Sequence, residues 1–132
     1  MNIFIDTSAF FALLDGDDAH HKKAKGVWGE VLKPENNLVT TNYVLIESFA
    51  LIQNRLGLDA LKEFQNDILP LIGIEWVPAH IHARAVSALL AVSKKSLSLV
   101  DCVSFEVIRY LGISKVFCFD PHFCEQGFGC IP

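Results

Sequence analysis

Short, almost wholly apolar runs alternate along this chain with longer segments of helical periodicity. The runs predict strands at Asn2–Ile5, Leu38–Thr40, Ile74–Val77, Lys115–Phe119 and Phe128–Ile131. Strands that are apolar on both faces are typical of a parallel sheet covered by helices on each side. Their alternation with helices predicts an α/β fold: a single-domain α/β/α sandwich over residues 1–132, with a central parallel sheet of four to five strands.

Helices are expected in the intervening segments. The apolar spacing and the turn residues place them at Thr7–Leu14, Ala19–Leu32, Asn42–Leu56, Leu58–Leu69, Ala79–Ser93 and from the cap at Ser98 to Gly112. In open sheets of this kind, ligands bind in the crevice beyond the carboxyl ends of the strands. The residues that follow each strand are therefore the first candidates for a functional site.

The charge of the chain limits how it can meet nucleic acid. Its 132 residues include 15 acidic and 11 basic side chains, for a net charge of -4. Binding to nucleic acid by bulk charge requires a basic protein, so any such contact here must be local. No uncharged stretch approaches the ~20 residues that span a bilayer, and the opening Met1–Asp6 has no basic signal-peptide region. A cytoplasmic protein is expected.

Four cysteines fall in the last third of the chain: Cys102, Cys118, Cys124 and Cys130. In a reducing cytosol we expect buried small hydrophobic residues rather than disulfides. His122 lies among them, but the spacing lacks the short C-x2-C pair that is typical of structural zinc sites. A zinc site is not expected.

Four carboxylates stand at positions that the fold would bring together. Asp6 and Asp120 directly follow strands, although helix capping and turn formation would also explain them. Glu47 lies on the apolar stripe of its helix, where a lone carboxylate would be costly. Asp101 follows Ser98 by three residues, which a capping box would also explain.

Converging carboxylates repel one another unless a cation neutralises them. Oxygen ligands without a Cys/His pair suit Mg²⁺ or Mn²⁺. The chain has no dinucleotide-binding G-x-G-x-x-G, no phosphate-binding P-loop, no G-x-S-x-G and no H-E-x-x-H. The four acids together therefore favour a magnesium or manganese site that can activate water and clamp a phosphate.

The same residues resemble a known family, the PIN-domain ribonucleases, and particularly the VapC-like toxins of type II toxin–antitoxin modules. The resemblance covers essentially the whole chain in order, and its motifs are Asp6-Thr7-Ser8, Glu47, Ser98-Leu99-Val100-Asp101-Cys102, Phe119-Asp120-Pro121-His122-Phe123 and Gly127-Phe128. It implies a PIN-like fold and a divalent-metal-dependent endoribonuclease that hydrolyses RNA with a metal-activated water. It also implies a homodimer and a cognate antitoxin protein as partners.

Residue roles follow from the resemblance. Asp6, Glu47, Asp101 and Asp120 would be the catalytic, metal-binding carboxylates, with Ser8 holding Asp6 or a water and Ser98 orienting Asp101. Basic residues that could meet the RNA backbone are Lys22, Lys23, Lys25, Lys94, Lys95 and Arg55. Solubilising surface charge is the alternative explanation for each of these.

Two other functions are alternatives to the ribonuclease. High mean hydropathy (+0.36) and apolar helices would suit a non-catalytic PIN-like protein-binding module. A phosphotransfer receiver domain would need paired acids after the first strand, where Asp6 is instead followed by Thr7-Ser8. The full set of four acids favours the enzyme.

Overall fold

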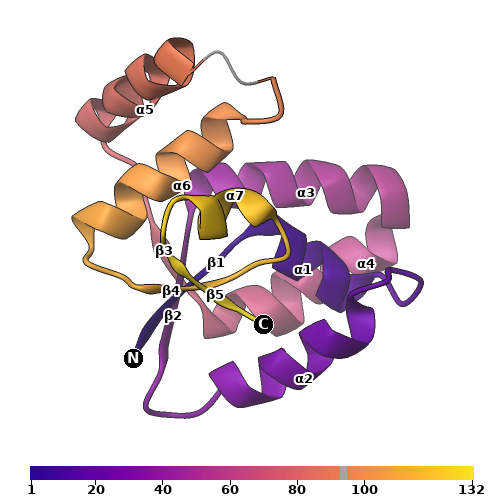
Figure 1. Ribbon diagram of the computed structural model, residues 1–132. Coiled ribbons are helices and arrows are strands. Elements are labelled where there is room, and N and C mark those ends of the chain that lie inside the picture. Colours follow the sequence, from indigo (N-terminus) through magenta and orange to yellow (C-terminus); the bar gives the residue numbers. More distant parts are fainter. Residues whose placement is uncertain (93–94) are drawn as a thin grey trace.

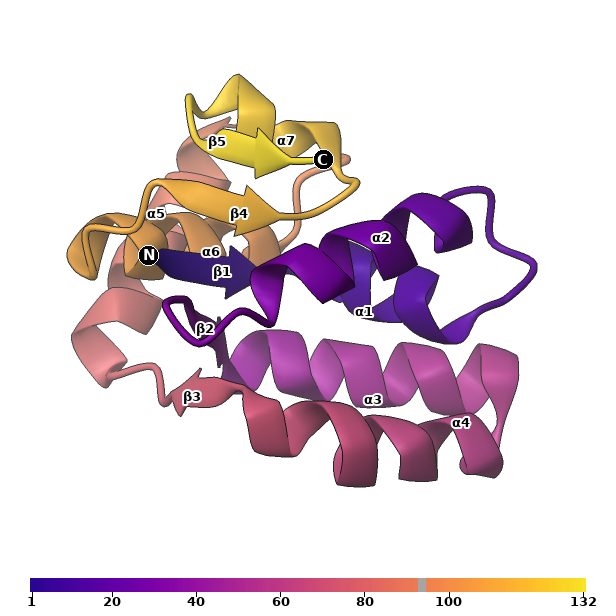
Figure 2. The same cartoon turned by 90° about the horizontal axis from the view of Figure 1, so that it is seen from below.

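Five parallel strands form one sheet in the computed structural model, which describes residues 1–92 and 95–132 (Figure 1). The strands are β1 (Asn2–Ile5), β2 (Asn37–Thr41), β3 (Gly73–Glu75), β4 (Lys115–Phe117) and β5 (Gly129–Ile131). Their order is β3-β2-β1-β4-β5, and every neighbouring pair is parallel. Figure 2 shows β1, β4 and β5 side by side with their arrows pointing the same way. The predicted α/β fold with a parallel central sheet is confirmed.

Helices connect the strands. They are α1 (Thr7–Leu14), α2 (His21–Val31), α3 (Asn42–Leu56), α4 (Leu58–Glu63), α5 (Ala79–Val92), α6 (Leu99–Tyr110) and α7 (Pro121–Glu125). α3 packs against α1 and α6, and it runs beside α4 (Figure 2). None of the helices in the described part of the chain is long and apolar enough to cross a membrane.

Several segment boundaries differ from the sequence prediction. The helix expected over Leu58–Leu69 ends as α4 at Glu63 and continues as a π-helical turn, η1 (Phe64–Ile68), and a 3-10 turn, η2 (Leu69–Leu71). Pro70 lies in η2, where its missing backbone donor prevents a regular α-helix from continuing. β4 ends at Phe117, two residues before the predicted end. Ser93, the predicted last residue of the fifth helix, lies outside the described residues.

A helix that the sequence analysis missed follows Asp120. Asp-Pro was interpreted there as a turn opener, whereas Asp120 is the N-cap of α7 and Pro121 is its first residue. Proline suits this position because the first helical N–H has no partner within the helix and the fixed φ matches the helix. The dipeptide therefore starts a helix at the edge of the sheet.

The cysteine prediction was wrong for two of the four residues. Cys124 at the end of α7 and Cys130 in β5 form a disulfide, with their Cα atoms 5.9 Å apart. The chain reverses between them at Gly127, whose φ of 88° is a left-handed conformation that glycine adopts without strain. Cys102 and Cys118 are free and buried, as expected. The bonded pair is not available as zinc ligands.

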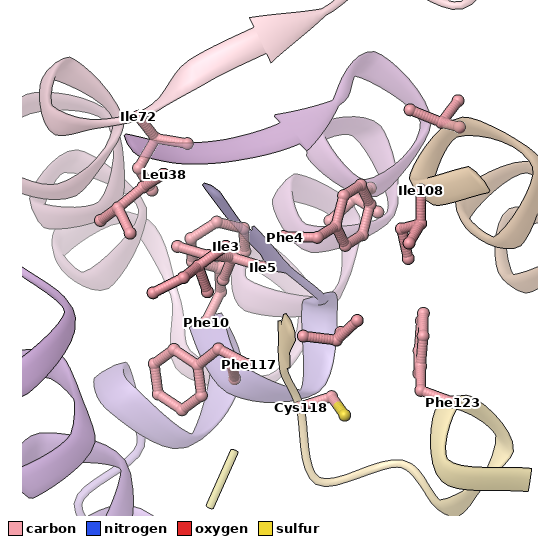
Figure 3. Close-up of a cluster of buried hydrophobic side chains, with 14 of the residues drawn as sticks. Ile3, Phe4, Ile5, Phe10, Leu38, Ile72, Ile108, Phe117, Cys118 and Phe123 are labelled. Carbon is pink, nitrogen blue, oxygen red and sulfur yellow. The ribbon is translucent and has the colours of Figure 1, made fainter. Parts of the chain in front are cut away.

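The hydrophobic core lies on both faces of the sheet and is built largely from aromatic and branched side chains (Figure 3). Phe4 and Ile5 of β1 and Phe117 of β4 are fully buried. Phe10 meets Phe64 edge to face at 5.1 Å, which ties α1 to η1. Burial at the centre of the sheet fixes the register that pairs Ile5 with Phe117. The residues after these two strands therefore emerge at the same edge.

Candidate active site

Asp6 leaves the sheet at the carboxyl end of β1 and is almost wholly buried, with 3% of its surface exposed. Its backbone N–H donates to the carbonyl of Phe117, so β1 stays attached to β4 up to this residue. As N-cap of α1, its Oδ2 accepts from the backbone N–H of Ser8 (3.2 Å). The capping role of Asp6 is confirmed, and its role as a metal-binding residue stays a prediction.

The Ser8 hydroxyl links two loops of the site. It donates to Asp6 Oδ2 at 2.7 Å and accepts from the backbone N–H of Phe119 at 2.9 Å. One hydroxyl thus holds the Asp6 carboxylate in a single orientation and fixes the segment between β4 and α7. This is the position expected of a residue that orients Asp6, although its part in catalysis stays a prediction.

We expect Ser8→Ala to lower the free energy of unfolding by about 1–3 kcal/mol, because it leaves the Phe119 N–H without its acceptor. Urea denaturation measures the change. Ser87→Ala, at an exposed serine of α5, is the matched control and should change stability by less than about 0.5 kcal/mol. Equal stability of the two variants would contradict the linking role of Ser8.

Asp101 is held by a reciprocal capping box at the start of α6. Ser98 Oγ accepts from the Asp101 N–H, and Asp101 Oδ2 accepts from the Ser98 N–H, both at 3.1 Å. Asp101 as a residue is 8% exposed. The capping explanation is confirmed, and since the cap uses one oxygen of Asp101, its predicted role as a metal-binding residue remains compatible with the cap.

Asp120 and Glu47 complete the acidic set. Asp120 Oδ1 accepts from the His122 N–H at 2.9 Å as the N-cap of α7. Glu47, half-buried on α3, receives a hydrogen bond from the Thr7 side chain, which lowers its pKa in part. The structure therefore brings side chains from α1, α3, α6 and α7 to one end of the sheet.

The charges of Asp101 and Asp120 act on the other acids of the set. Burial, with smaller contributions from the charges of Asp101 and Asp120, raises the pKa of Asp6 to about 7 against the opposing hydrogen bonds from Ser8. Burial likewise raises the pKa of Glu47 and that of Asp101, and Asp120 adds to both shifts. The site is poised to hold cations, since a cation would relieve both the burial and the repulsion.

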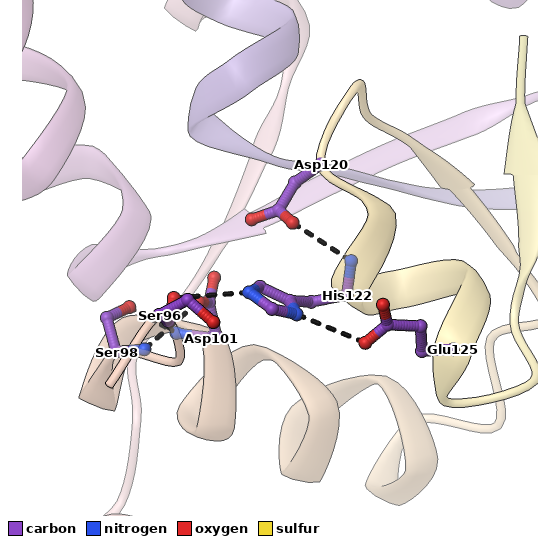
Figure 4. A network of polar contacts seen from close by, with 6 residues as sticks. All are labelled: Ser96, Ser98, Asp101, Asp120, His122 and Glu125. Atoms are coloured by element: carbon purple, nitrogen blue, oxygen red, sulfur yellow. Dashed lines mark hydrogen bonds and ion pairs between the residues drawn. The ribbon is translucent and has the colours of Figure 1, made fainter. Parts of the chain in front are cut away.

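His122 joins this cluster and was missed as a site residue. Its ring, Asp101 and Asp120 offer three ligand atoms within 4.8 Å of one another (Figure 4). However, Nε2 lies 3.1 Å from the carbonyl of Ser96, and Nδ1 lies 3.2 Å from Glu125 Oε2. The carbonyl and the carboxylate both accept hydrogen bonds, and the Glu125 bond raises the pKa of the ring, which favours its protonated form. In that form His122 contributes positive charge rather than a metal-binding lone pair.

A sequence signal for His122 existed in its position relative to Asp120. Once Asp120 is an N-cap, His122 lies in the first turn of α7, beside the cap. The remaining ligand atoms are carboxylate oxygens, and this donor set fits a hard divalent ion such as Mg²⁺ or Mn²⁺. The structure supports a metal site without identifying the ion.

The basic residues predicted to contact RNA lie in different parts of the structure. Lys23 lines a cavity together with Asp120, and Lys95 directly precedes Ser96, whose carbonyl contacts His122. Arg55 lies roughly two helical turns beyond Glu47 on α3, with its guanidinium 6.0 Å from the centre of the Phe11 ring. Lys22 and Lys25 are exposed on α2, and Lys94 lies outside the described residues.

Comparisons with known proteins agree with this architecture. The PIN domain family matches residues 3–129. The 23S rRNA-specific endonuclease VapC20 of Mycobacterium tuberculosis (strain H37Rv) is 34% identical over 127 residues, which cover 96% of this chain and 95% of that protein. The family match, over residues 3–129, is a range that contains the positions of all four acids.

Solved structures give the same result. The crystal structure of Mycobacterium tuberculosis VapC20, described as a Sarcin-Ricin loop cleaving toxin, has a TM-score of 0.85 and 33% identity, and covers 96% of this chain and 95% of its own. FitAcB from Neisseria gonorrhoeae shares the fold, with a TM-score of 0.71 and 15% sequence identity. The match covers 98% of this chain and 96% of that chain. With the fold, the family match and a relative above 30% identity in agreement, the chain belongs to the PIN-domain family.

Proposed function

We propose that this chain is a divalent-metal-dependent endoribonuclease that hydrolyses phosphodiester bonds of RNA. The observation that carries the proposal is the cluster of four mutually repelling carboxylates, Asp6, Glu47, Asp101 and Asp120, at the carboxyl end of the sheet. Family membership and the 34% identity to a 23S rRNA-specific endonuclease support it.

The four carboxylates would hold Mg²⁺ or Mn²⁺. A divalent ion bound there supplies a more acidic water and offsets the charge of the phosphate under attack. Ser8 keeps Asp6 in one orientation through its 2.7 Å hydrogen bond, and the capping box with Ser98 does the same for Asp101. Pre-positioned carboxylates need little reorganisation during the reaction, which is where this chain's own residues contribute.

Positive groups around the cluster would receive the RNA backbone. His122 adds a cation beside Asp101 and Asp120, and Lys23 and Lys95 lie close to the same edge. We propose local contacts to phosphate from these residues, with Lys22, Lys25, Lys94 and Arg55 as further candidates. Because the net charge of the chain is -4, its contacts with RNA must be local ones of this kind.

Ribosomal RNA is the substrate to test first. We propose the sarcin–ricin loop, because VapC20 is described as cleaving it. The purified protein is expected to cut a hairpin of that loop in Mg²⁺ or Mn²⁺ and to lose the activity in excess chelator. Gel analysis of end-labelled RNA measures this. Cleavage at the same rate in chelator would contradict metal dependence, and no cleavage of any RNA would contradict the function.

Protein partners follow from the exposed apolar side chains. Ile46, Trp76 and Leu90 are 68%, 71% and 75% exposed. We propose that a second copy of the chain and a cognate antitoxin cover such surfaces, and that the protein acts as a toxin in the cytoplasm. A non-catalytic binding module would use the same surfaces but would tolerate loss of all four acids.

A further inference from the structure

A cavity of about 260 Å³ lies beside the carboxylate cluster. Its walls come from three parts of the chain: His20 and Lys23 at the start of α2, the residues between β4 and α7, and the last residues from Cys130 to Pro132. Asp120 belongs both to this cavity and to the carboxylate cluster. An occupant of the cavity would therefore be the direct neighbour of a phosphate held at the acids.

A stacked pair of aromatic rings forms one wall of this cavity. The rings of His20 and Phe119 have centroids 4.5 Å apart and an interplanar angle of 16°. Phe119 is fixed by an edge-to-face contact with Phe117 and by the bond from its N–H to Ser8. His20 is exposed, and its backbone N–H donates to Asp18 Oδ1 at 2.7 Å. The pair is a preformed platform on which a base can stack.

The other walls suit a nucleotide. Lys23 follows His20 by three residues, so both lie on the same side of the start of α2. Among the residues that line the cavity, Lys23 provides a cation and Asp120 a carboxylate, so the walls are close to neutral. Pro121, Pro132 and the disulfide add apolar surface. Stacking, rather than charge, would then supply most of the affinity.

The volume of the cavity suits a single nucleotide. Sites for drug-sized ligands measure about 300–1,000 Å³, and this cavity is slightly smaller. A base inside a duplex has both faces covered by its neighbours and cannot stack on a protein ring. The occupant must therefore be unpaired, as in the loops and bulges that proteins read in RNA.

We propose that this cavity binds the unpaired nucleotide next to the scissile phosphate, with its base stacked against the His20–Phe119 pair and its phosphate near Lys23. The inference rests on the proposed function and deepens it, since it assigns the nucleotide beside the cut to this cavity. His20 is then a residue that binds the base beside the cut by stacking.

The test combines a protein variant with an RNA lacking one base. Wild type, His20→Ala and His20→Phe are assayed on a sarcin–ricin loop hairpin and on hairpins with an abasic residue at either position flanking the mapped cut. We expect His20→Ala to lower kcat/KM ~10-fold, mainly through KM, as for loss of one stacked base. An abasic residue at one of the two positions should slow cleavage by wild type by a similar factor. His20→Ala should cut that abasic hairpin no more slowly than it cuts the intact hairpin.

Two controls separate stacking from other roles. His20→Phe retains an aromatic face and should keep the wild-type rate and the sensitivity to the abasic position. His80→Ala removes another exposed histidine, which lies on α5 and contacts Tyr110 of α6. This variant should leave kcat/KM unchanged. Thermal unfolding of each variant reports whether the fold is retained.

Two outcomes would overturn the inference, and they are distinguishable. In the first outcome, wild type cuts RNA, but an abasic residue at either flanking position changes the rates of wild type and His20→Ala by the same factor. The cavity then does not bind a base, and the proposed function stands. If wild type cuts neither the hairpin nor total ribosomal RNA, the proposed function fails and the inference fails with it.

Discussion

Replacing Asp101 with asparagine is expected to reduce RNA cleavage by more than about 100-fold, because loss of a residue that merely orients a metal ligand costs about 10–100-fold. Asparagine has the same shape and can still accept the hydrogen bond from the Ser98 N–H, so the start of α6 should be preserved. What is lost is one negative charge among four at the site. Single-turnover cleavage of the hairpin measures the effect.

The matched control for Asp101→Asn is Asp59→Asn. Asp59 is an exposed acid in the first turn of α4, so the same charge is removed from the same kind of helical position. That variant should cleave at the wild-type rate. Calorimetric Mn²⁺ binding should weaken for Asp101→Asn alone. If Asp101→Asn cleaves within threefold of wild type, the acids do not perform the reaction.

Patterning alone predicted the parts of the fold that are locally determined. α3 begins at Asn42 and ends at Leu56 as expected, because Gly57 can adopt the φ of 90° at which the helix ends. β1 also matches, since its run of apolar residues ends at Asp6, the N-cap of the next helix. Both segments carry their boundary signals within a few residues.

The errors arose where one sequence allows two local structures. Asp120-Pro121 opens turns and also starts helices, and only packing of Phe123 into the core decides for α7. The disulfide depended on that helix, because α7 and the turn at Gly127 bring Cys124 to Cys130. The pairing of His20 with Phe119 joins distant segments, and nothing near either residue predicts it.

The acids themselves could be predicted because topology places them. Residues after neighbouring parallel strands must share an edge, which brings Asp6 and Asp120 together once the strands are recognised. Their electrostatic state could not be predicted, since it depends on burial. The pKa of about 7 at Asp6 arises from a carboxylate with 3% of its surface exposed, beside other carboxylates.

This raised pKa leads to the second large effect: metal-free protein should lose stability as pH rises. Asp6 has a pKa of 3.8 when exposed and about 7 in the fold. Between these values the folded state binds a proton that the unfolded state has released, so the free energy of unfolding falls with increasing pH. At about 1.4 kcal/mol per unit, the loss from Asp6 approaches 4 kcal/mol by pH 8.

Three other groups act in the same direction. The pKa values of Glu47 and Asp101 are also raised, chiefly by burial, so deprotonating either one costs stability as pH rises. The raised pKa of His122 means that its favourable contact with Glu125 is present at low pH and is lost when the ring deprotonates. Wild type should therefore lose stability more steeply than Asp6 alone predicts.

Urea denaturation in chelator at pH 4.5, 6 and 8 measures this loss, with Asp6→Asn as the informative variant. Asparagine cannot ionise, so Asp6→Asn should have a shallower pH dependence and exceed wild type in stability at pH 8. Asp17→Asn, an exposed acid whose backbone N–H contacts Asp15, should follow wild type. Excess Mn²⁺ should stabilise wild type most at pH 8, because a divalent ion binds the deprotonated carboxylates. A metal-free wild type as stable at pH 8 as at pH 4.5 would mean that the acids do not converge.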